Sequence, residues 1–304
     1  MSDGSRPGPA SGGPSIALVT PAFNAGKYIE STLSSVLTQG YDRLEYVVVD
    51  GGSSDNTVDA IRARESDLTA WVSEPDEGMY DAINKGFAKT SGEVMGWINA
   101  DDVLLPGTLA TVGEVFGRFP EIEWISTRTP AAIDERGSII KINRHAAFSA
   151  HGFARGVHFV HAGWPAECFL QQEGTFWRRS LWNRAGGKLD ASYKLAGDFE
   201  LWCRFAQHAE LVSIDVPLGL FRYHPEQASG QNLAKYLEEA RRAYAANGYG
   251  PPTKARGLVT MAKKLFSDGA LHWFISKGVL HRSPRLTYDW GARVWSLERP
   301  SGRS

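Results

Sequence analysis

The sequence predicts an α/β fold in which helices cover both faces of a doubly wound, mostly parallel sheet. Three observations predict it. Strand-like runs alternate with helical segments, with a repeat of about 25 to 30 residues that suits a βα unit. The run IALVT at 16–20 is continuously apolar and β-branched, as in strands buried on both faces, and LEYVVV at 44–49 repeats the pattern. The chain has 304 residues, of which 42% are hydrophobic and 22% charged, so it can build a large core and is not a disordered, collagenous or coiled-coil chain.

The first half of the chain contains four such strands and the helices between them. Apolar runs predict strands at 16–20, 44–49, 69–73 and 93–98. Three helices are expected on the apolar faces formed by Ile29, Leu33, Val36 and Leu37, by Val58 and Ile61, and by Met79, Ala82 and Ile83. Asp55 stands where the second helix needs its N-cap.

The second half of the chain shows a less regular alternation of strand and helix patterns. We expect a helix at 108–119, strands at 122–127, 138–143 and 167–172, and a polar loop at 144–165. A further helix begins near Asp198; its core side chains are expected to be Phe199, Trp202 and Phe205, with Glu200 and Arg204 facing outward.

Composition excludes several classes of protein. The net charge is −1 from 33 basic and 34 acidic residues, which is not the balance of a nucleic-acid binder. Cys168 and Cys203 are too few for a disulfide framework or a cysteine zinc site and are expected to be buried. Residues 1–14 predict a disordered leader without the apolar region of a secretory signal. Since no run approaches the ~20 apolar residues of a membrane span, we expect a cytoplasmic protein.

The C-terminal segment differs from the rest. Residues 254–304 carry 10 Lys or Arg against 3 Asp or Glu, interleaved with aromatic residues. This pattern suits peripheral contact with the inner face of an anionic membrane. The alternative is that the aromatic residues pack on the catalytic domain or, in a homodimer, on a second subunit.

Polar residues follow each of the four predicted strands. They are Asn24, Asp50, Glu74, Asp76, Asp101 and Asp102. In parallel sheets these positions share the carboxyl edge, where open α/β folds bind ligands. No GxGxxG follows a strand and no GxxxxGK[ST] occurs, so dinucleotide and P-loop sites lack support. Several carboxylates at one edge instead suit a divalent cation that holds phosphate.

Five motifs in a fixed order resemble the family 2 glycosyltransferases, which have the GT-A fold. They are TPAFNAGKYIESTLSSVLTQ, EYVVVDGGSSDNT, SEPDEGMYDAINKG, GWINADD, and QEGTFWRRSLWNRAGG followed by LAGDFELWCRF. The resemblance covers about residues 15–230. It implies a GT-A catalytic domain there, the nucleotide-diphospho-sugar transferase fold, and leaves 231–304 as a C-terminal extension that we expect to be helical.

The resemblance also implies roles for individual residues. Asp50 would hydrogen-bond the base of a nucleotide-sugar donor, in a pocket lined by the turn Pro21, Phe23 and Asn24. Asp101 and Asp102 match the family's DxD-type site, with Asp101 on the donor and Asp102 as the main ligand of Mn²⁺ or Mg²⁺. Asp198 would be the catalytic base. His224 is a candidate near the metal, and Asp76 and Arg178 are candidates for donor binding.

Each of these residues also has a structural alternative. Asp50 before two glycines is a common turn former. The Asp101–Asp102 pair and Asp198 can each cap a helix, and a lone histidine such as His224 is often structural. Arg178 can be solvated or can meet phosphate through bidentate hydrogen bonds.

The function expected is metal-dependent, inverting transfer of a sugar to a hydroxyl of a glycan or lipid-linked acceptor. UDP is the expected nucleotide from family frequency alone. A non-catalytic nucleotide-sugar or glycan-binding module on the same fold is the alternative. A sugar-1-phosphate nucleotidyltransferase would need a Gly- and Arg-rich loop after the first strand, where PAFNAGKY stands.

Overall fold

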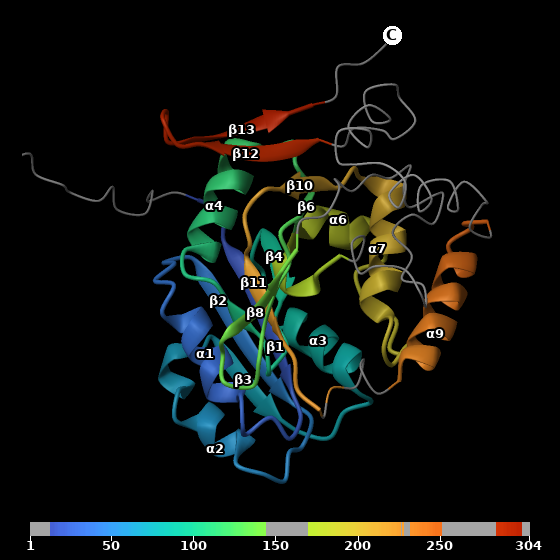
Figure 1. The fold of residues 1–304 in the computed structure, drawn as a ribbon. Coiled ribbons are helices and arrows are strands. Elements are labelled where there is room, and N and C mark those ends of the chain that lie inside the picture. The colour runs from blue at the N-terminus through green and yellow to red at the C-terminus, as the bar shows by residue number, and fades with distance from the viewer. Residues whose placement is uncertain (1–12, 144–169, 226, 228–231, 251–283, 300–304) are drawn as a thin grey trace, which may run out of the picture.

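The computed structural model describes residues 13–143, 170–225, 227, 232–250 and 284–299 (Figure 1). The elements up to residue 118 are β1 (Ile16–Ala22), α1 (Ile29–Leu37), β2 (Leu44–Asp50), α2 (Thr57–Arg62), a 3₁₀ turn (Glu65–Asp67), β3 (Ala70–Ser73), α3 (Met79–Phe87), β4 (Val94–Trp97), β5 (Val103–Leu104) and α4 (Thr108–Arg118). The later elements are β6 (Trp124–Thr127), β7 (Ala131–Ile133), β8 (Ile139–Ile142), a 3₁₀ turn (Gln172–Gly174), β9 (Thr175–Arg178), α6 (Arg179–Arg184), α7 (Gly197–His208), β10 (Val212–Ile214), β11 (Gly219–Arg222), α9 (Leu233–Ala246), β12 (Arg285–Asp289) and β13 (Val294–Glu298).

The main sheet has nine strands in the order β13-β12-β10-β6-β9-β4-β1-β2-β3. Strands β3, β2, β1 and β4 are parallel neighbours, whereas β9 runs antiparallel to both β4 and β6. The chain moves outward from β1 through β2 to β3 and then returns to place β4 on the other side of β1. This reversal opens a crevice at the carboxyl ends of β1 and β4, the usual ligand site of open α/β sheets.

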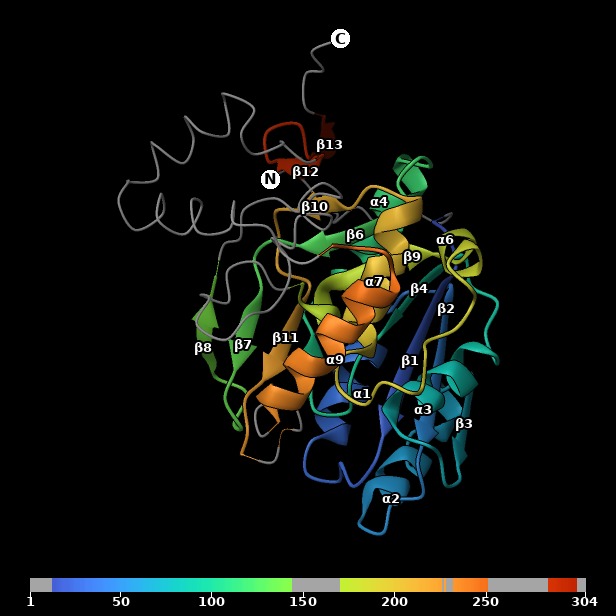
Figure 2. The same ribbon diagram turned by 90° about the vertical axis from the view of Figure 1, so that its right-hand side faces the viewer.

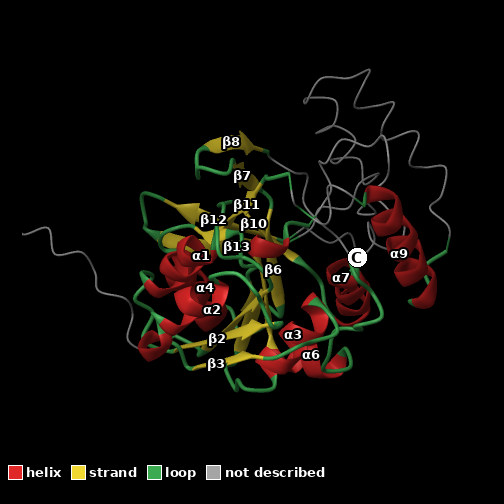
Figure 3. Cartoon of the chain, turned by 90° about the horizontal axis from the view of Figure 1, so that it is seen from below, coloured by secondary structure: helices red, strands yellow, loops and turns green. Residues whose placement is uncertain are grey.

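Helices cover both faces of this sheet, as predicted. Figure 3 shows α1, α2 and α4 on one face and α3, α6 and α7 on the other, with α9 outside α7. Successive residues of β1 point to opposite faces, so Ile16 and Leu18 pack under α1 and α4 while Ala17 and Val19 pack under α3. Because both faces are buried, β1 has no polar face, which explains the continuous apolar run in the sequence.

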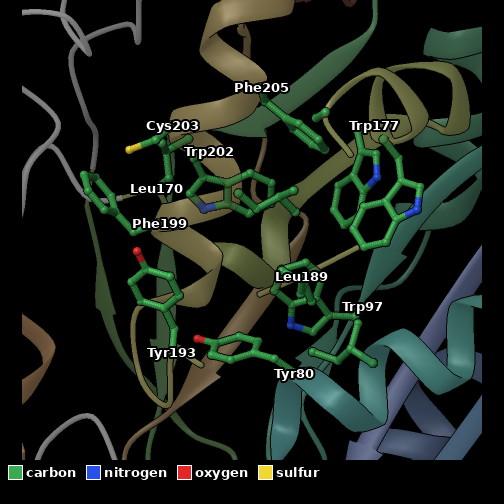
Figure 4. Close-up of a cluster of buried hydrophobic side chains, with 14 of the residues drawn as sticks. Tyr80, Trp97, Leu170, Trp177, Leu189, Tyr193, Phe199, Trp202, Cys203 and Phe205 are labelled. Atoms are coloured by element: carbon green, nitrogen blue, oxygen red, sulfur yellow. The ribbon is translucent and has the colours of Figure 1, made fainter. Parts of the chain in front are cut away.

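An aromatic cluster fastens α7 to the sheet (Figure 4). The ring of Trp202 on α7 stacks on Trp97 at the end of β4, with centroids 5.8 Å apart and an interplanar angle of 8°. Trp177 and Phe205 meet Trp202 edge-on or tilted. Large rigid rings in mutual contact fix the position of α7 relative to the carboxyl end of β4.

A second, four-stranded sheet stands beside the first, in the order β5-β11-β7-β8 (Figure 2). Its β5 directly follows the Asp101–Asp102 pair, and β11 pairs antiparallel with β5 so that Leu220 faces Val103. If this antiparallel pairing is continued past Leu220, the next residues of the chain lie beside Asp101, which is about 120 residues earlier in the sequence. The small sheet therefore joins two distant segments at the end of β4.

Some local expectations are wrong. Met79 is 37% exposed, and Tyr80 takes the expected core position on α3. Residues 170–172 are not a strand, because β9 begins only at Thr175. Glu200 on α7 is buried and pairs with Arg204. Cys203 is buried as expected, whereas Cys168, residues 1–12 and the whole of the predicted 144–165 loop lie outside the described residues.

The extension is only partly helical. Residues 233–246 form α9, but residues 285–298 form the hairpin β12–β13, which pairs with β10 and lengthens the main sheet. The sheet thus contains strands from both sides of the expected boundary at residue 230. Trp295 is 4% exposed and packs with the core together with Tyr288, so these two aromatic residues follow the alternative of packing on the fold, whereas Trp290 is 81% exposed.

Candidate functional site

The loops after β1 and β2 are joined by hydrogen bonds. Asn24, with φ of 47°, accepts a hydrogen bond on its Oδ1 from the Ser54 N–H at 2.9 Å, and its own N–H donates to Ser53 Oγ at 2.7 Å. Asparagine tolerates this left-handed backbone better than most residues. The Asp55 carboxylate accepts from the N–H groups of Gly26 and Thr57, so it binds both the β1 loop and the start of α2. The two loops form one rigid rim at the carboxyl edge.

Asp50 organises the second of these loops. Its carboxylate is fully buried and accepts hydrogen bonds from the N–H groups of Gly52 and Ser53, at 3.1 and 3.0 Å, and from Ser73 Oγ at 2.7 Å. A further short hydrogen bond comes from Ser53 Oγ. The turn-forming role that the sequence left open is therefore present in the structure.

Asp76 stands against Gly51, between the ends of β2 and β3. A Cβ atom added to Gly51 would lie 2.6 Å from Asp76 Oδ2, so a side chain at residue 51 would collide with this carboxylate. Asp76 Oδ1 accepts from the Gly78 N–H at 2.8 Å, which fixes the carboxylate in place. The DGGS motif and Asp76 thus fit each other. Of the remaining rim residues, Pro21 is buried in β1 and Phe23 is 66% exposed.

Asp101 and His224 meet at the end of β4. Asp101 Oδ2 lies 2.9 Å from His224 Nε2, and the Asp101 side chain is 30% exposed. The ring of His224 packs on Tyr28 with centroids 4.9 Å apart. Its Nδ1 is buried, and no partner for it is found among the described residues. The register of β5 and β11 brings this pair together.

Asp102 points the other way, into the protein. Its Oδ1 accepts from the Arg222 N–H at 2.8 Å and its Oδ2 from Asn99 Nδ2 at 3.1 Å, and the side chain is fully buried. Burial, together with the charges of Glu173 and Asp101, raises the pKa of Asp102 well above its ordinary value. The expectation that Asp102 is the main metal ligand does not suit this geometry, because the acid that reaches the open side is Asp101.

Glu173, which the sequence analysis did not single out, lies beside Asp102. It is 4% exposed, and burial raises its pKa to about 7, with smaller contributions from the charges of Asp101 and Asp198. The 3₁₀ turn that carries Glu173 packs against β4 and β11. The only sequence signal was an acid in the QEG motif just before an apolar strand.

Arg222 holds this part of the site together. Its guanidinium donates to the Asp101 carbonyl at 2.6 Å and to Ser31 Oγ at 3.2 Å, and it stacks over the ring of Tyr28. Its backbone N–H donates to Asp102. A single buried arginine thus orients both acids after β4, and it lies two residues before His224.

Asp101 Oδ2 and His224 Nε2 are hydrogen-bonded to each other at 2.9 Å. Two ligands about 2.1 Å from one ion and at a right angle are also separated by roughly 3 Å, so the same two side chains can accept a divalent cation in place of that bond. The described residues contain no cluster of three or more His, Cys, Asp or Glu able to hold a metal. Two protein ligands suffice for Mg²⁺-like ions, which keep waters and bind substrate phosphates.

Asp198 lies in the first turn of α7. Its Oδ1 accepts from the Phe199 N–H at 2.7 Å, and its own N–H lies 3.4 Å from the Tyr80 hydroxyl on α3. Burial raises the pKa of Asp198 to about 6, with a smaller contribution from the Glu239 carboxylate. The Trp97–Trp202 stack fixes α7, and with it Asp198, relative to the end of β4. An acid with a pKa of about 6 is largely ionised at pH 7 and can accept a proton there.

Arg178 does not reach the site. It pairs with Val94 at the start of β4, so it lies at the amino edge, about 10 Å of strand away from the carboxyl edge. Its guanidinium donates to the carbonyls of Ile122 and Phe116 at 2.8 and 2.7 Å. The expected donor-binding role is wrong, because the chain reverses direction in β9.

Replacing this arginine tests the correction. Arg178→Met is expected to destabilise the fold by about 1 to 3 kcal/mol, because it leaves buried carbonyls without their donor. The KM for a nucleotide-sugar donor should stay within about twofold of wild type. Urea unfolding and steady-state kinetics measure the two effects. A tenfold rise in donor KM in the folded variant would restore Arg178 to the donor site.

Comparison with known proteins agrees with this geometry. The sequence model for glycosyl transferase family 2 matches residues 17–128. An uncharacterized glycosyltransferase of Mycobacterium tuberculosis is 30% identical over 204 residues, which are 66% of this chain and 72% of the relative. Another, from Nostoc sp., is 30% identical over 144 residues, covering 41% of this chain and 45% of that protein.

Two solved structures share the fold. One is S. aureus TarS 1–349 in complex with UDP-GlcNAc, with a TM-score of 0.60 and 15% identity over 77% of this chain and 66% of that one. The other is the mannosyltransferase PcManGT from Pyrobaculum calidifontis in complex with GDP-Man and Mn²⁺, with a TM-score of 0.54 and 20% identity over 88% of this chain and 81% of that one. With a family region that matches residues 17–128 and a 30% identical relative of which it covers 72%, the chain belongs to glycosyl transferase family 2.

Proposed function

We propose that this glycosyltransferase moves a sugar from a nucleoside-diphosphate sugar to an acceptor hydroxyl with a divalent cation and with inversion of the anomeric centre. The observation that carries the proposal is the arrangement at the carboxyl edge. The Asp101–His224 pair stands after β4, and Asp198 stands at the start of α7, which is stacked on the end of the same strand.

Asp101 and His224 would hold Mn²⁺ or Mg²⁺ together with the donor diphosphate. The bound cation would offset the negative charge that develops on the leaving diphosphate. Support comes from the 2.9 Å spacing of Asp101 Oδ2 and His224 Nε2 and from the Asp101 side chain, which is 30% exposed. Arg222 keeps Asp101 in place through its carbonyl oxygen.

Asp198 would take the proton from the acceptor hydroxyl. An acid with a pKa of about 6 is largely ionised at pH 7 and is a stronger base than an ordinary aspartate. Attack by that oxygen on the anomeric carbon, from the face opposite the diphosphate, breaks the sugar–phosphate bond and inverts the centre. Phe199 N–H holds the carboxylate in the orientation for this step.

The nucleotide would lie on the rim formed by the β1, β2 and β3 loops. Phe23 offers an exposed ring for stacking on a base, and Asn24 and Asp76 belong to the same rim. Asp50 supports this rim through the Ser53 loop, in addition to any direct bond to the base. UDP is the proposed nucleotide, in line with the UDP-GlcNAc complex of TarS.

The acceptor is proposed to be a glycan or a lipid-linked sugar. Among the described residues, no helix has both the length and the apolar composition needed to cross a bilayer. Trp290, 81% exposed at the tip of the hairpin, with Arg293 beside it, is the described feature that suits peripheral contact with an anionic surface. The remaining basic and aromatic residues of 254–283 lie outside the described residues.

A donor screen tests the proposal. UDP- and GDP-sugars are incubated with the full chain, with Mn²⁺ or EDTA, and release of free nucleoside diphosphate is measured. We expect release or transfer with one donor, stimulated by Mn²⁺ and abolished by EDTA, and an inverted anomeric signal in the product by NMR. Donor binding without any turnover, with a range of acceptors present, would support the binding-module alternative.

A further inference from the structure

Glu239, on the outer helix α9, binds the chain just before Asp198. Figures 2 and 3 show α9 lying alongside α7. The Glu239 carboxylate accepts hydrogen bonds from three consecutive backbone N–H groups. These come from Lys194 at 3.0 and 3.1 Å, from Leu195 at 2.8 Å and from Ala196 at 3.0 Å.

The Glu239 side of this contact is buried. Glu239 is only 8% exposed, whereas its neighbour Glu238 faces solvent. The three N–H groups come just before α7, where backbone donors lack partners within the helix. Loss of the carboxylate would leave them without this acceptor, and the N–H of the buried Ala196 would then favour a shift of the segment.

The segment held in this way leads directly to the catalytic carboxylate. Asp198 follows Ala196 by two residues, and its side chain is otherwise fixed only by the Phe199 N–H among the hydrogen bonds of the described residues. The Trp202 stack fixes the body of α7. It does not fix the entry to the helix, which is where Glu239 acts.

We propose that Glu239 is a positioning residue for the catalytic base: it fixes residues 194–196 so that Asp198 faces the acceptor hydroxyl in a single orientation. The proposal rests on the role of Asp198 given above. It assigns a part of the mechanism to α9, which lies beyond the segment that resembles the family. Misplacement by about 1 Å is enough to cost a reaction roughly 100-fold, so such a contact has a measurable effect on rate.

The charge of Glu239 gives a second, independent signature. Several groups surround Asp198, namely Tyr80, Glu173, Cys203, Tyr236 and Glu239. Of these, Glu239 adds to the raised pKa of Asp198 through its negative charge. Removing that charge should lower the pKa of Asp198, so the acid limb of the pH–rate profile should move to lower pH.

The test compares Glu239→Gln with Glu238→Gln in the full chain. Glutamine keeps the size of the side chain but replaces one acceptor oxygen by a donor. We expect Glu239→Gln to lower kcat at least about 10-fold, to leave donor KM within about twofold, to shift the acid limb to lower pH and to speed hydrogen exchange of amides 194–196. Glu238→Gln should change none of these.

Two results with Glu239→Gln would overturn the inference. Unchanged exchange at 194–196 would show that the hydrogen bonds do not hold the segment. Faster exchange with unchanged kcat and an unchanged acid limb would make Glu239 structural only. If Glu239→Gln does not fold, Glu239→Asp is used instead, because it keeps the charge but has a shorter side chain. The inference then requires a lower kcat with an unchanged acid limb of the pH–rate profile.

Failure of the proposed function gives a different pattern. If Asp198→Asn were as active as wild type, Asp198 would not be the base, whatever Glu239 does. In that case, or while no acceptor is known, the electrostatic coupling between Glu239 and Asp198 can be measured directly. Carbon NMR titration of the Asp198 carboxyl in wild type and in Glu239→Gln gives the two pKa values to compare. An equal pKa in both proteins would contradict the inference.

Discussion

Asp198→Asn is expected to lower kcat at least about 100-fold while donor KM and nucleoside-diphosphate affinity stay near wild type. Asparagine has the same shape, and its Oδ1 can still accept the Phe199 N–H, so the start of α7 should be preserved. It cannot accept a proton from the acceptor. Steady-state kinetics with varied donor and acceptor measure the split.

Asp190→Asn is the matched control, because Asp190 is an exposed aspartate in the segment that leads to α7. Its rate should equal that of wild type. Turnover near the wild-type level in Asp198→Asn would mean that another group removes the proton.

The same carboxylate sets the expected pH dependence. The base works only when ionised, and its pKa is raised to about 6, so the wild-type rate should fall about tenfold for each pH unit below that value and level off above it. Residual activity of Asp198→Asn should lack this limb. An inflection near the ordinary aspartate value, about 4, would show that the acid is not buried in the working enzyme.

Asp101→Ala is expected to abolish stimulation by Mn²⁺, with a loss of at least about 100-fold in kcat/KM for the donor, because metal stabilisation of the leaving group is worth several kcal/mol. Nucleoside-diphosphate binding, measured by calorimetry, should weaken when Mn²⁺ is present and stay unchanged in EDTA. His224→Ala should behave in the same way.

Two variants sharpen this result. Asp59→Asn, at an exposed acid on α2 that pairs with Arg62, should keep the full Mn²⁺ response. Asp102→Asn should lose stability but keep the response, because Asp102 faces Arg222 and Glu173 inside the fold. Loss of the Mn²⁺ response in Asp102→Asn alone would return the ligand role to Asp102.

The sequence predicts the parallel half of the fold well. Strands β1 and β4 and most of β2 are buried on both faces, so their runs are mainly apolar, whereas the edge strand β3 is only partly buried. Helices α1 and α3 show the period of half-buried helices. The residues after these strands meet at one edge by topology alone. Asn24, Asp50, Asp76 and Asp101 could therefore be placed together without coordinates.

The rest depends on contacts that periodicity does not encode. The sequence of two adjacent acids does not reveal which of Asp101 and Asp102 faces the open carboxyl edge of the sheet. The pairing of β5 with β11 decides which acid does so. The edge at which Arg178 emerges depends on the direction of β9, which its apolar pattern does not reveal. Glu239 lies 43 residues after Ala196, on a helix whose sequence shows only an amphipathic pattern.

The hairpin β12–β13 affects how the protein folds while it is being synthesised. β10 pairs with β12, so Ser213 finds its neighbour Arg285 only 72 residues later, and the buried side chains of Leu286 and Trp295 arrive later still. At a translation rate of about 5 to 20 residues per second, that edge of the sheet stays open for several seconds on the ribosome. During this interval β10 is an unpaired strand edge, the surface on which nascent chains aggregate. Fragments ending near residue 250 keep that edge open permanently, so low solubility of such fragments in expression trials would reflect an unfinished sheet rather than loss of the catalytic domain.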